Sequence, residues 1–120
     1  MIKRFDRIDV ATTDISDAAS IYEKNFGFKV TRSGENASVS IGGAEIRLAS
    51  GAPVADAIKA NGEGMFAICL EADDLDQVIA AFKQAGLATG AIRKDAGRRV
   101  LAVDPKIANQ VPLFIFDRKG

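Results

Sequence analysis

The residue types in this chain limit the chemistry that it can perform. No histidine occurs, and Cys69 is the only cysteine. These two facts exclude Ser-His and Cys-His catalytic pairs, an intramolecular disulfide and a thiolate metal cluster within one chain. With no histidine in the chain to activate Cys69 as a nucleophile, the ordinary role of such a residue is a small core or pocket-lining group. Any chemistry must therefore use carboxylates, lysines, arginines, Tyr22 or a bound cofactor.

Charged and apolar side chains alternate along several stretches that have the period of β-strands. The residues that share one face of such a stretch are Arg7 and Asp9 in the first, Glu45 and Arg47 in another, Met65, Ala67, Cys69 and Glu71 in a third, and Pro112, Phe114 and Phe116 in the last. Arginines and carboxylates can orient a polar ligand, and Phe and Met offer flat, adaptable contacts.

The composition is that of an ordinary globular domain. The 120 residues suit a single domain with a core, and the 16 basic and 16 acidic side chains leave no net charge. Without a basic run we expect no nucleic-acid partner. No apolar run reaches the ~18 residues of a membrane span, and the N-terminal stretch lacks the apolar core of a signal peptide. We therefore expect no membrane partner and a cytoplasmic location.

A strand that runs into a capped helix occurs twice, over residues 5–28 and 66–87. In the first copy Asp14 is expected to cap the helix and Gly27 to end it. In the second copy Asp73 or Asp74 is the cap, and Gly86 ends the helix. Setting Asp14 on Asp74 also aligns Tyr22 with Phe82, and we expect both rings to anchor their helices on the sheet. The chain is therefore built from two similar modules.

Each module continues with three more candidate strands. These strands cover residues 28–33, 37–41 and 44–49 in module one, and residues 88–93, 98–103 and 110–116 in module two. The turns between them carry Gly42-Gly43 and the Pro and Asn that follow Asp104. We interpret residues 1–120 as a single domain, with module one at 1–50, a linker with a possible short helix at 51–64, and module two at 65–120. Each module thus reads β-α-β-β-β.

This duplicated unit, the stretch FDRIDVATTDISDAASIYEKNFGFKV and the turn before the last strand together resemble the vicinal oxygen chelate superfamily. That superfamily includes glyoxalase I, bleomycin resistance proteins and extradiol dioxygenases. The resemblance covers nearly the whole chain. It implies an α+β fold in which two β-α-β-β-β modules form a cupped eight-stranded mixed sheet with helices on the convex face. It also implies a ligand on the concave face, usually beside a divalent metal ion.

The resemblance places the four metal-ligand positions of the superfamily on Arg7, Arg47, Ala67 and Pro112. Arginine is a permanent cation without a lone pair to give, and Ala and Pro have no side-chain donor atom. We therefore expect no bound metal and no cofactor. The lining that the resemblance implies for the cup consists of Arg7, Asp9, Glu45, Arg47, Met65, Ala67, Cys69, Glu71, Pro112, Phe114 and Phe116. The alternative is that Arg7 and Arg47 pair with Asp9, Glu45 or Glu71 as a structural ion network, and both interpretations can hold together.

Three classes of function fit this lining. The first is a metal-free protein that binds or sequesters a small molecule, as in the bleomycin resistance branch, with Arg7, Asp9, Glu45, Arg47, Met65, Ala67, Cys69, Phe114 and Phe116 as ligand contacts. The second is a relative of the glyoxalase-like lyases, isomerases or dioxygenases that uses Glu45 or Glu71 as a base and Arg7 or Arg47 as a clamp. The third is a structural or regulatory module. We expect the first, a binding protein rather than an enzyme. The sign of the ligand's charge stays open.

The resemblance also implies how the chain assembles. Cupped sheets of this kind have exposed edges, which relatives cover by pairing two chains. We therefore expect a homodimer that binds a small molecule.

Overall fold

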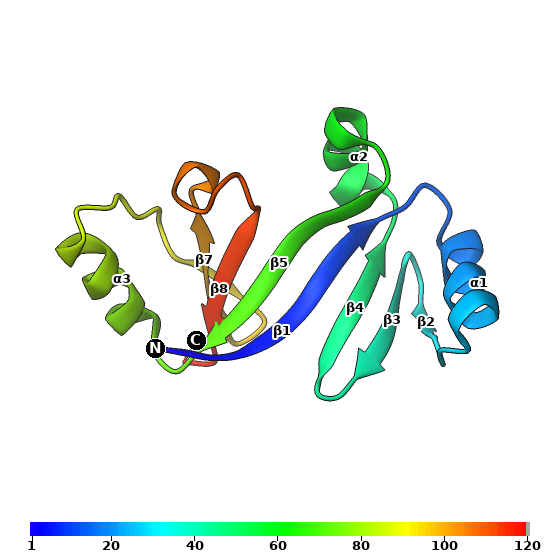
Figure 1. The fold of residues 1–120 in the computed structure, drawn as a ribbon, viewed down its shortest axis with the longest axis horizontal. Helices are drawn as coiled ribbons and strands as arrows, with labels where there is room; N and C mark the ends of the chain where they lie inside the picture. The colour runs from blue at the N-terminus through cyan, green and yellow to red at the C-terminus, as the bar shows by residue number, and fades with distance from the viewer. Residues whose placement is uncertain (120) are drawn as a thin grey trace. The chain divides into compact units, whose positions relative to one another are not determined.

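The computed structural model of the chain describes residues 1–119, and Gly120, the last residue of the predicted second module, lies outside them. The described residues form eight strands in one mixed sheet, in the order β2-β3-β4-β1-β5-β8-β7-β6, with three α-helices (Figure 1). The strands are β1 Ile2–Ala11, β2 Thr31–Ser33, β3 Asn36–Ile41, β4 Ala44–Ala49, β5 Gly64–Ala72, β6 Arg93–Asp95, β7 Arg98–Val103 and β8 Leu113–Asp117. The helices are α1 Ile15–Phe26, α2 Ala55–Asn61 and α3 Leu75–Gln84, and short 3₁₀ turns occupy Ala52–Val54 and Pro105–Ile107. The predicted α+β class and the repeated β-α-β-β-β plan are confirmed.

The residue contacts divide the chain into two compact units, which are described in turn. The α1 unit consists of Arg7–Phe66, and the α3 unit consists of Met1–Asp6 together with the chain from Ala67 onward. None of the helices in the described residues is long and apolar enough to cross a membrane.

In the α1 unit, β1 lies parallel to β4, and β4, β3 and β2 continue as an antiparallel meander. Helix α1 begins where predicted, because the side chain of Asp14 accepts a hydrogen bond from the Asp17 N–H at 3.1 Å. It ends at Gly27, whose φ of 70° is the left-handed conformation that glycine adopts without strain. The sequence signals at both helix ends are confirmed.

The apolar side of the α1 unit is thinly covered. Val39 and Leu48 are fully buried in the sheet, but Ala19 is the only buried residue of α1. Tyr22 is half-buried and contacts the rings of Phe26 and Phe28, with centroids 6.0 and 6.3 Å away. Tyr22 therefore takes part in an aromatic cluster at the surface, while Phe82 packs against a buried core. The two aligned aromatic residues do not play the same part.

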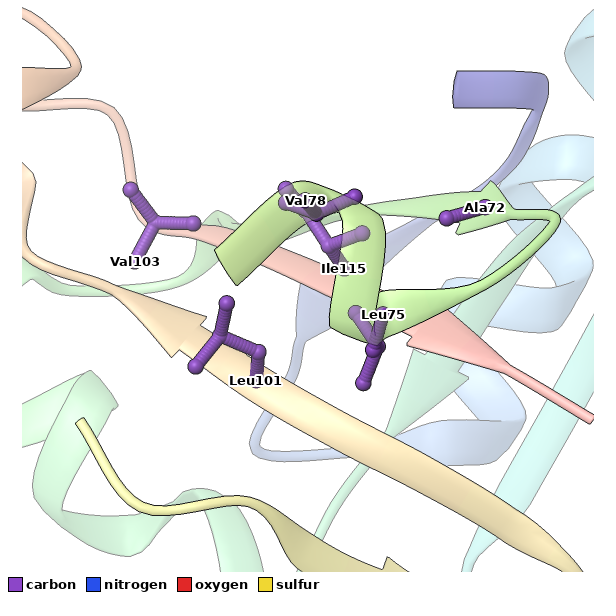
Figure 2. Close-up of a cluster of buried hydrophobic side chains, with 6 residues drawn as sticks. All are labelled: Ala72, Leu75, Val78, Leu101, Val103 and Ile115. Atoms are coloured by element: carbon purple, nitrogen blue, oxygen red, sulfur yellow. The ribbon is translucent and has the colours of Figure 1, made fainter. Parts of the chain in front are cut away.

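In the α3 unit, β5 lies parallel to β8, and β8, β7 and β6 continue antiparallel. Helix α3 covers β8 and β7 with the buried core of this unit between them. That core consists of Ala72, Leu75, Val78, Leu101, Val103 and Ile115 (Figure 2). The alternation in β7 and β8 sends every second residue into this core and the residues between them to the other face.

A buried carboxylate holds the first turn of α3 to the last strand. Asp117 is fully buried, and its Oδ2 accepts a hydrogen bond from the Leu75 N–H at 2.7 Å. Arg99 donates to both oxygens of Asp117, and the side chain of Asp74 caps the helix by accepting from the Asp76 N–H. Of the two predicted caps, Asp74 is the one in use.

Three predicted strand boundaries are wrong. The stretch 88–93 is irregular up to Ile92, and β6 begins only at Arg93, where pairing with β7 starts. The stretch 28–33 forms a strand only over Thr31–Ser33. The last strand begins at Leu113, because Pro112 has no N–H to give to a sheet; its carbonyl instead accepts from the Ile68 N–H at 2.9 Å. The predicted linker 51–64 contains a 3₁₀ turn and α2.

Candidate functional site

Four of the predicted ligand contacts form a compact block of alternating charge in the α1 unit. The parallel register of β1 and β4 sets Arg7 opposite Glu45 and Asp9 opposite Arg47. Nε of Arg7 donates to Oδ1 of Asp9 at 2.9 Å, and Nη2 of Arg47 donates to Oε1 of Glu45 at 2.9 Å. Two positive and two negative charges cancel, so this block has the geometry of the structural ion network that was one of the two sequence interpretations.

The other predicted contacts differ in their accessibility. Met65 belongs to the α1 unit and is 53% exposed. Ala67 and Cys69 belong to the α3 unit and are buried, at 1% and 3% exposure. Cys69 lies opposite Phe114 in the register of β5 and β8. Phe114 is half-buried, so of these three residues in the α3 unit it is the one with a face open to a ligand.

The four positions at which relatives hold a metal ion do not fit one here. Arg7 and Arg47 are engaged with carboxylates, and a guanidinium has no lone pair to give to a metal ion. Ala67 has only a buried methyl group, and Pro112 has no side-chain donor atom. Over residues 1–119, no group of three or more His, Cys, Asp or Glu residues is placed to hold a metal ion.

The α3 unit carries an aromatic ring with two arginines over it. Phe116 is 2% exposed, and the guanidinium carbons of Arg98 and Arg118 lie 4.6 and 5.6 Å from its ring centroid. Nε of Arg118 also donates to Oε2 of Glu71 at 3.1 Å. Cations over an aromatic face are attracted by its negative quadrupole. We call the surface formed by Glu71, Arg98, Phe114, Phe116 and Arg118 the Phe116 face.

Glu71 is buried beneath this face and is already held by cations. Nη1 of Arg4 donates to its Oε1 at 3.1 Å, and Nζ of Lys3 lies 4.0 Å from its Oε2. Burial acts to raise the pKa of Glu71, but the hydrogen bond from Arg4 and the charge and hydrogen bond of Arg118 outweigh it and lower the pKa below its usual value. Arg4 also donates to Asp6 at 2.7 Å. Glu71 is therefore an ionised structural carboxylate.

The charges around the Phe116 face do not cancel. Four cationic side chains meet three carboxylates: Lys3, Arg4, Arg98 and Arg118 against Asp6, Glu71 and Asp95, which lies opposite Arg98 in the register of β6 and β7. Arg98 contacts the Phe116 ring and forms no ion pair with any carboxylate of residues 1–119. Its N–H groups can donate to an anion, because a guanidinium has five of them in a planar fork.

Sequence reasoning missed the arginines of this face. Arg118 follows Phe116 by two residues, which is a visible strand-period signal, but the strand was expected to end at Phe116. Arg98 reaches the ring through the antiparallel register of β7 and β8, which pairs Val100 with Phe116. No local pattern specifies that register.

Comparison with known proteins places the chain among similar folds. A family model described as the Glyoxalase/Bleomycin resistance protein/Dioxygenase superfamily matches residues 4–119. A search of curated proteins found no match.

Three solved structures illustrate the similarity. A protein of Bacillus halodurans C-125 described as hypothetical is 23% identical, with a TM-score of 0.80, over 98% of this chain and 95% of that one. A Streptomyces coelicolor methylmalonyl-CoA epimerase variant in complex with 2-nitronate-propionyl-CoA is 20% identical, with a TM-score of 0.77, over 100% of both chains. The methylmalonyl-CoA epimerase of Mycobacterium tuberculosis is 17% identical, with a TM-score of 0.76, over 97% of this chain and 88% of that one. At these identities the likeness establishes the fold.

Proposed function

Because the chain belongs to the glyoxalase/bleomycin resistance protein/dioxygenase superfamily, we propose that it binds a small organic anion on its Phe116 face, without a metal ion. The observation that carries this proposal is the pair of guanidinium groups, from Arg98 and Arg118, that both lie over one buried ring. A guanidinium that rests on an aromatic ring is held in place before the ligand arrives, which lowers the entropy lost on binding.

The balance of charge selects an anion over a cation. Asp6 and Glu71 are both engaged with Arg4, and Arg98 forms no ion pair with Asp95, which lies opposite it across β6 and β7, or with any other carboxylate of residues 1–119. An approaching anion thus meets an uncompensated positive charge and a planar fork of donors. Phe114, half-buried beside this charge, offers a flat contact for an apolar part of the ligand.

The proposed role of Phe116 differs from the sequence expectation, which made this residue a direct ligand contact. Phe116 is buried and two guanidinium groups lie over its ring, so its part in binding is to support Arg98 and Arg118. In the α1 unit, Arg7 and Arg47 are engaged with Asp9 and Glu45. A contact between the ligand and these four residues stays a prediction from the sequence.

An enzyme that uses Glu71 as its base has less support. A general base works best when its pKa lies near the working pH, but the pKa of Glu71 is lowered and both of its oxygens accept hydrogen bonds from arginines. An isomerase-like activity is a second candidate because of the epimerases with the same fold. The ligand named for the Streptomyces coelicolor enzyme, 2-nitronate-propionyl-CoA, carries anionic groups, and this supports an anionic ligand class under either candidate.

Amide NMR titration of the chelator-treated protein tests this proposal with two matched probes. Indole-3-propionate is an anion, and tryptamine has the same ring and the same two-carbon arm with a cationic end. We expect saturable shifts of the Phe114 and Phe116 amides with indole-3-propionate and none with tryptamine.

Two variants make the test specific to the face. Arg98→Gln removes the unpaired charge and should weaken the binding of indole-3-propionate about fivefold, the scale of one charged hydrogen bond at a partly exposed site. Lys94→Gln is the control, because Lys94 is exposed on β6 and its register with Arg99 puts it on the opposite face of the sheet. Equal affinity in the two variants, or shifts confined to residues away from the face, would place the anion site elsewhere.

A further inference from the structure

The α1 unit contains an apolar groove between α1 and the sheet that plays no part in the proposed anion site. Its volume is about 310 Å³, at the small end of the range for ligand sites. The groove is lined by Val10, Ala11, Thr12, Asp17, Ala18, Ile21, Tyr22, Phe26, Leu48, Glu63 and Gly64. All of these residues belong to the α1 unit.

The groove exists because α1 presents small side chains to the sheet. Ala18 lines the groove and Ala19 is the one buried residue of the helix, so no large side chain fills the space over Leu48. The larger residues of α1 stand at the rim, where Ile21 is 45% and Phe26 is 62% exposed. Exposed apolar groups that border a cavity are typical of binding surfaces.

The polar groups of the groove are negative. Asp17 and Glu63 line it, and no lysine or arginine does. Oε1 of Glu63 accepts hydrogen bonds from the N–H and hydroxyl of Thr13, at 2.7 and 2.6 Å, and from the Thr12 hydroxyl at 3.2 Å. These bonds hold the carboxylate in place and lower the pKa of Glu63, which keeps it ionised. No residue in 1–119 donates to its Oε2.

We propose that this groove binds a small amphipathic organic cation, an amine attached to an aromatic or branched apolar group. The apolar group would lie over Leu48 between Ala18 and the rings of Tyr22 and Phe26, and the ammonium group would donate to Oε2 of Glu63. Tyr22 and Phe26 add to the preference for a cation, because aromatic faces attract ammonium groups. An anion of the same shape meets two carboxylates and is rejected.

This site is independent of the anion site, because it uses other residues in the other unit and the opposite charge. The two probes named above therefore test both, with opposite expectations. Tryptamine should produce saturable shifts at the amides of Ala18, Leu48 and Gly64, and indole-3-propionate should not. A failure here with success at the Phe116 face would overturn the groove proposal alone.

Matched variants identify the carboxylate. Glu63→Gln keeps an oxygen that can accept from Thr12 and Thr13 but removes the charge, and it should weaken tryptamine binding about fivefold. Asp56→Asn is the control, because Asp56 lies exposed on α2 outside the groove and should leave the affinity unchanged. If Glu63→Gln unfolds part of the α1 unit, the amide spectrum reports it, and Asp17→Asn then replaces it with the same expected direction.

Two results would overturn the proposal. One is equal binding of tryptamine and indole-3-propionate at the groove amides, which would make the groove a purely apolar contact. The other is a set of groove amide shifts that depends on protein concentration without any probe. That result would show that a second copy of the chain covers the groove.

Discussion

The ion pair between Asp117 and Arg99 should contribute more to stability than any exposed ion pair of the chain, and Asp117→Asn tests this. Asp117 is fully buried, and its two oxygens accept from Nε and Nη2 of Arg99 and from the N–H groups of Leu75 and Lys119. An asparagine has nearly the same shape, but its NH₂ group would take the place of one accepting oxygen. That NH₂ group would then point at an N–H donor. The variant therefore loses both a charge and at least one hydrogen bond.

The magnitude follows from the pKa of Asp117. The hydrogen bond from Arg99 is the largest cause that lowers it, against the opposing effect of burial, from an ordinary 3.8 to about 2. A shift of this size corresponds to roughly 2 kcal/mol of stability at neutral pH. Leaving the Arg99 guanidinium without its main partner adds to the loss, so we expect Asp117→Asn to lower the free energy of unfolding by about 2 to 4 kcal/mol. That is a large share of the ~5 to 15 kcal/mol of a typical domain.

Urea unfolding followed by circular dichroism measures this difference. The control is Asp76→Asn, because the Asp76 side chain is 71% exposed and lies 3.3 Å from Nη1 of the same arginine. It should cost less than about 1 kcal/mol, as exposed ion pairs do. Equal losses in the two variants, or a loss below about 0.5 kcal/mol for Asp117→Asn, would refute the larger contribution of the Asp117–Arg99 pair.

The pH dependence gives a second check on the same residue. The pKa of Asp117 is lower in the folded chain than in the unfolded chain, so its contribution is fully present above the unfolded value and is lost as the pH falls through the folded value. The stability gap between the wild-type chain and Asp117→Asn should therefore be constant above about pH 5 and shrink between about pH 4 and 2. A gap that stays constant down to pH 2 would contradict the low pKa.

Three further predictions concern packing, metal ions and assembly. Phe82→Ala should lower the free energy of unfolding by about 2 to 3 kcal/mol because Phe82 packs on the buried core, and Tyr22→Ala should cost about half as much; thermal melts with the reverse order would contradict this. Metal analysis of protein purified without chelator should find less than one equivalent of Zn, Ni, Mn or Fe per chain, since Arg7 and Arg47 are engaged with carboxylates. The homodimer expected from the sequence should appear as a dimer mass in light scattering at high micromolar concentration, and a monomer mass there would count against it.

The elements that the sequence predicted correctly are those with local signals. Asp14 and Gly27 specify the ends of α1 through the hydrogen bonds and the positive φ that their types favour. Gly42-Gly43 joins β3 to β4, and β4 and β7 have the predicted bounds because each alternates regularly.

The elements that were misjudged depend on contacts between distant residues. Strand β6 starts at Arg93 because β7 provides a partner only from there, across a turn at Ala96 and Gly97 with φ of 49° and 79°. Alternation alone predicts the start of this strand five residues too early, at residue 88. Pro112 lies outside β8 because proline has no N–H to donate to the sheet. Its carbonyl still accepts a hydrogen bond from the Ile68 N–H.

In the candidate site, too, local patterns were predictable from the sequence and contacts between distant residues were not. Strand alternation set Arg7 and Asp9 on one face, but it could not say that their side chains pair with each other. The Arg98 contact with Phe116 requires the register of β7 and β8, which only the folded sheet supplies. Residue types therefore indicated a site with aromatic and charged groups, and the tertiary fold decided which arginine stays available to a ligand.

The measurement that tests metal-free anion binding most directly is calorimetry of indole-3-propionate with chelator-treated protein. We expect saturable binding at one site per chain, unchanged by added Zn²⁺ or Mn²⁺ and weakened about fivefold by Arg98→Gln. Metal-free binding is contradicted if the chelator-treated protein gives no binding heat and the added metal ion restores it.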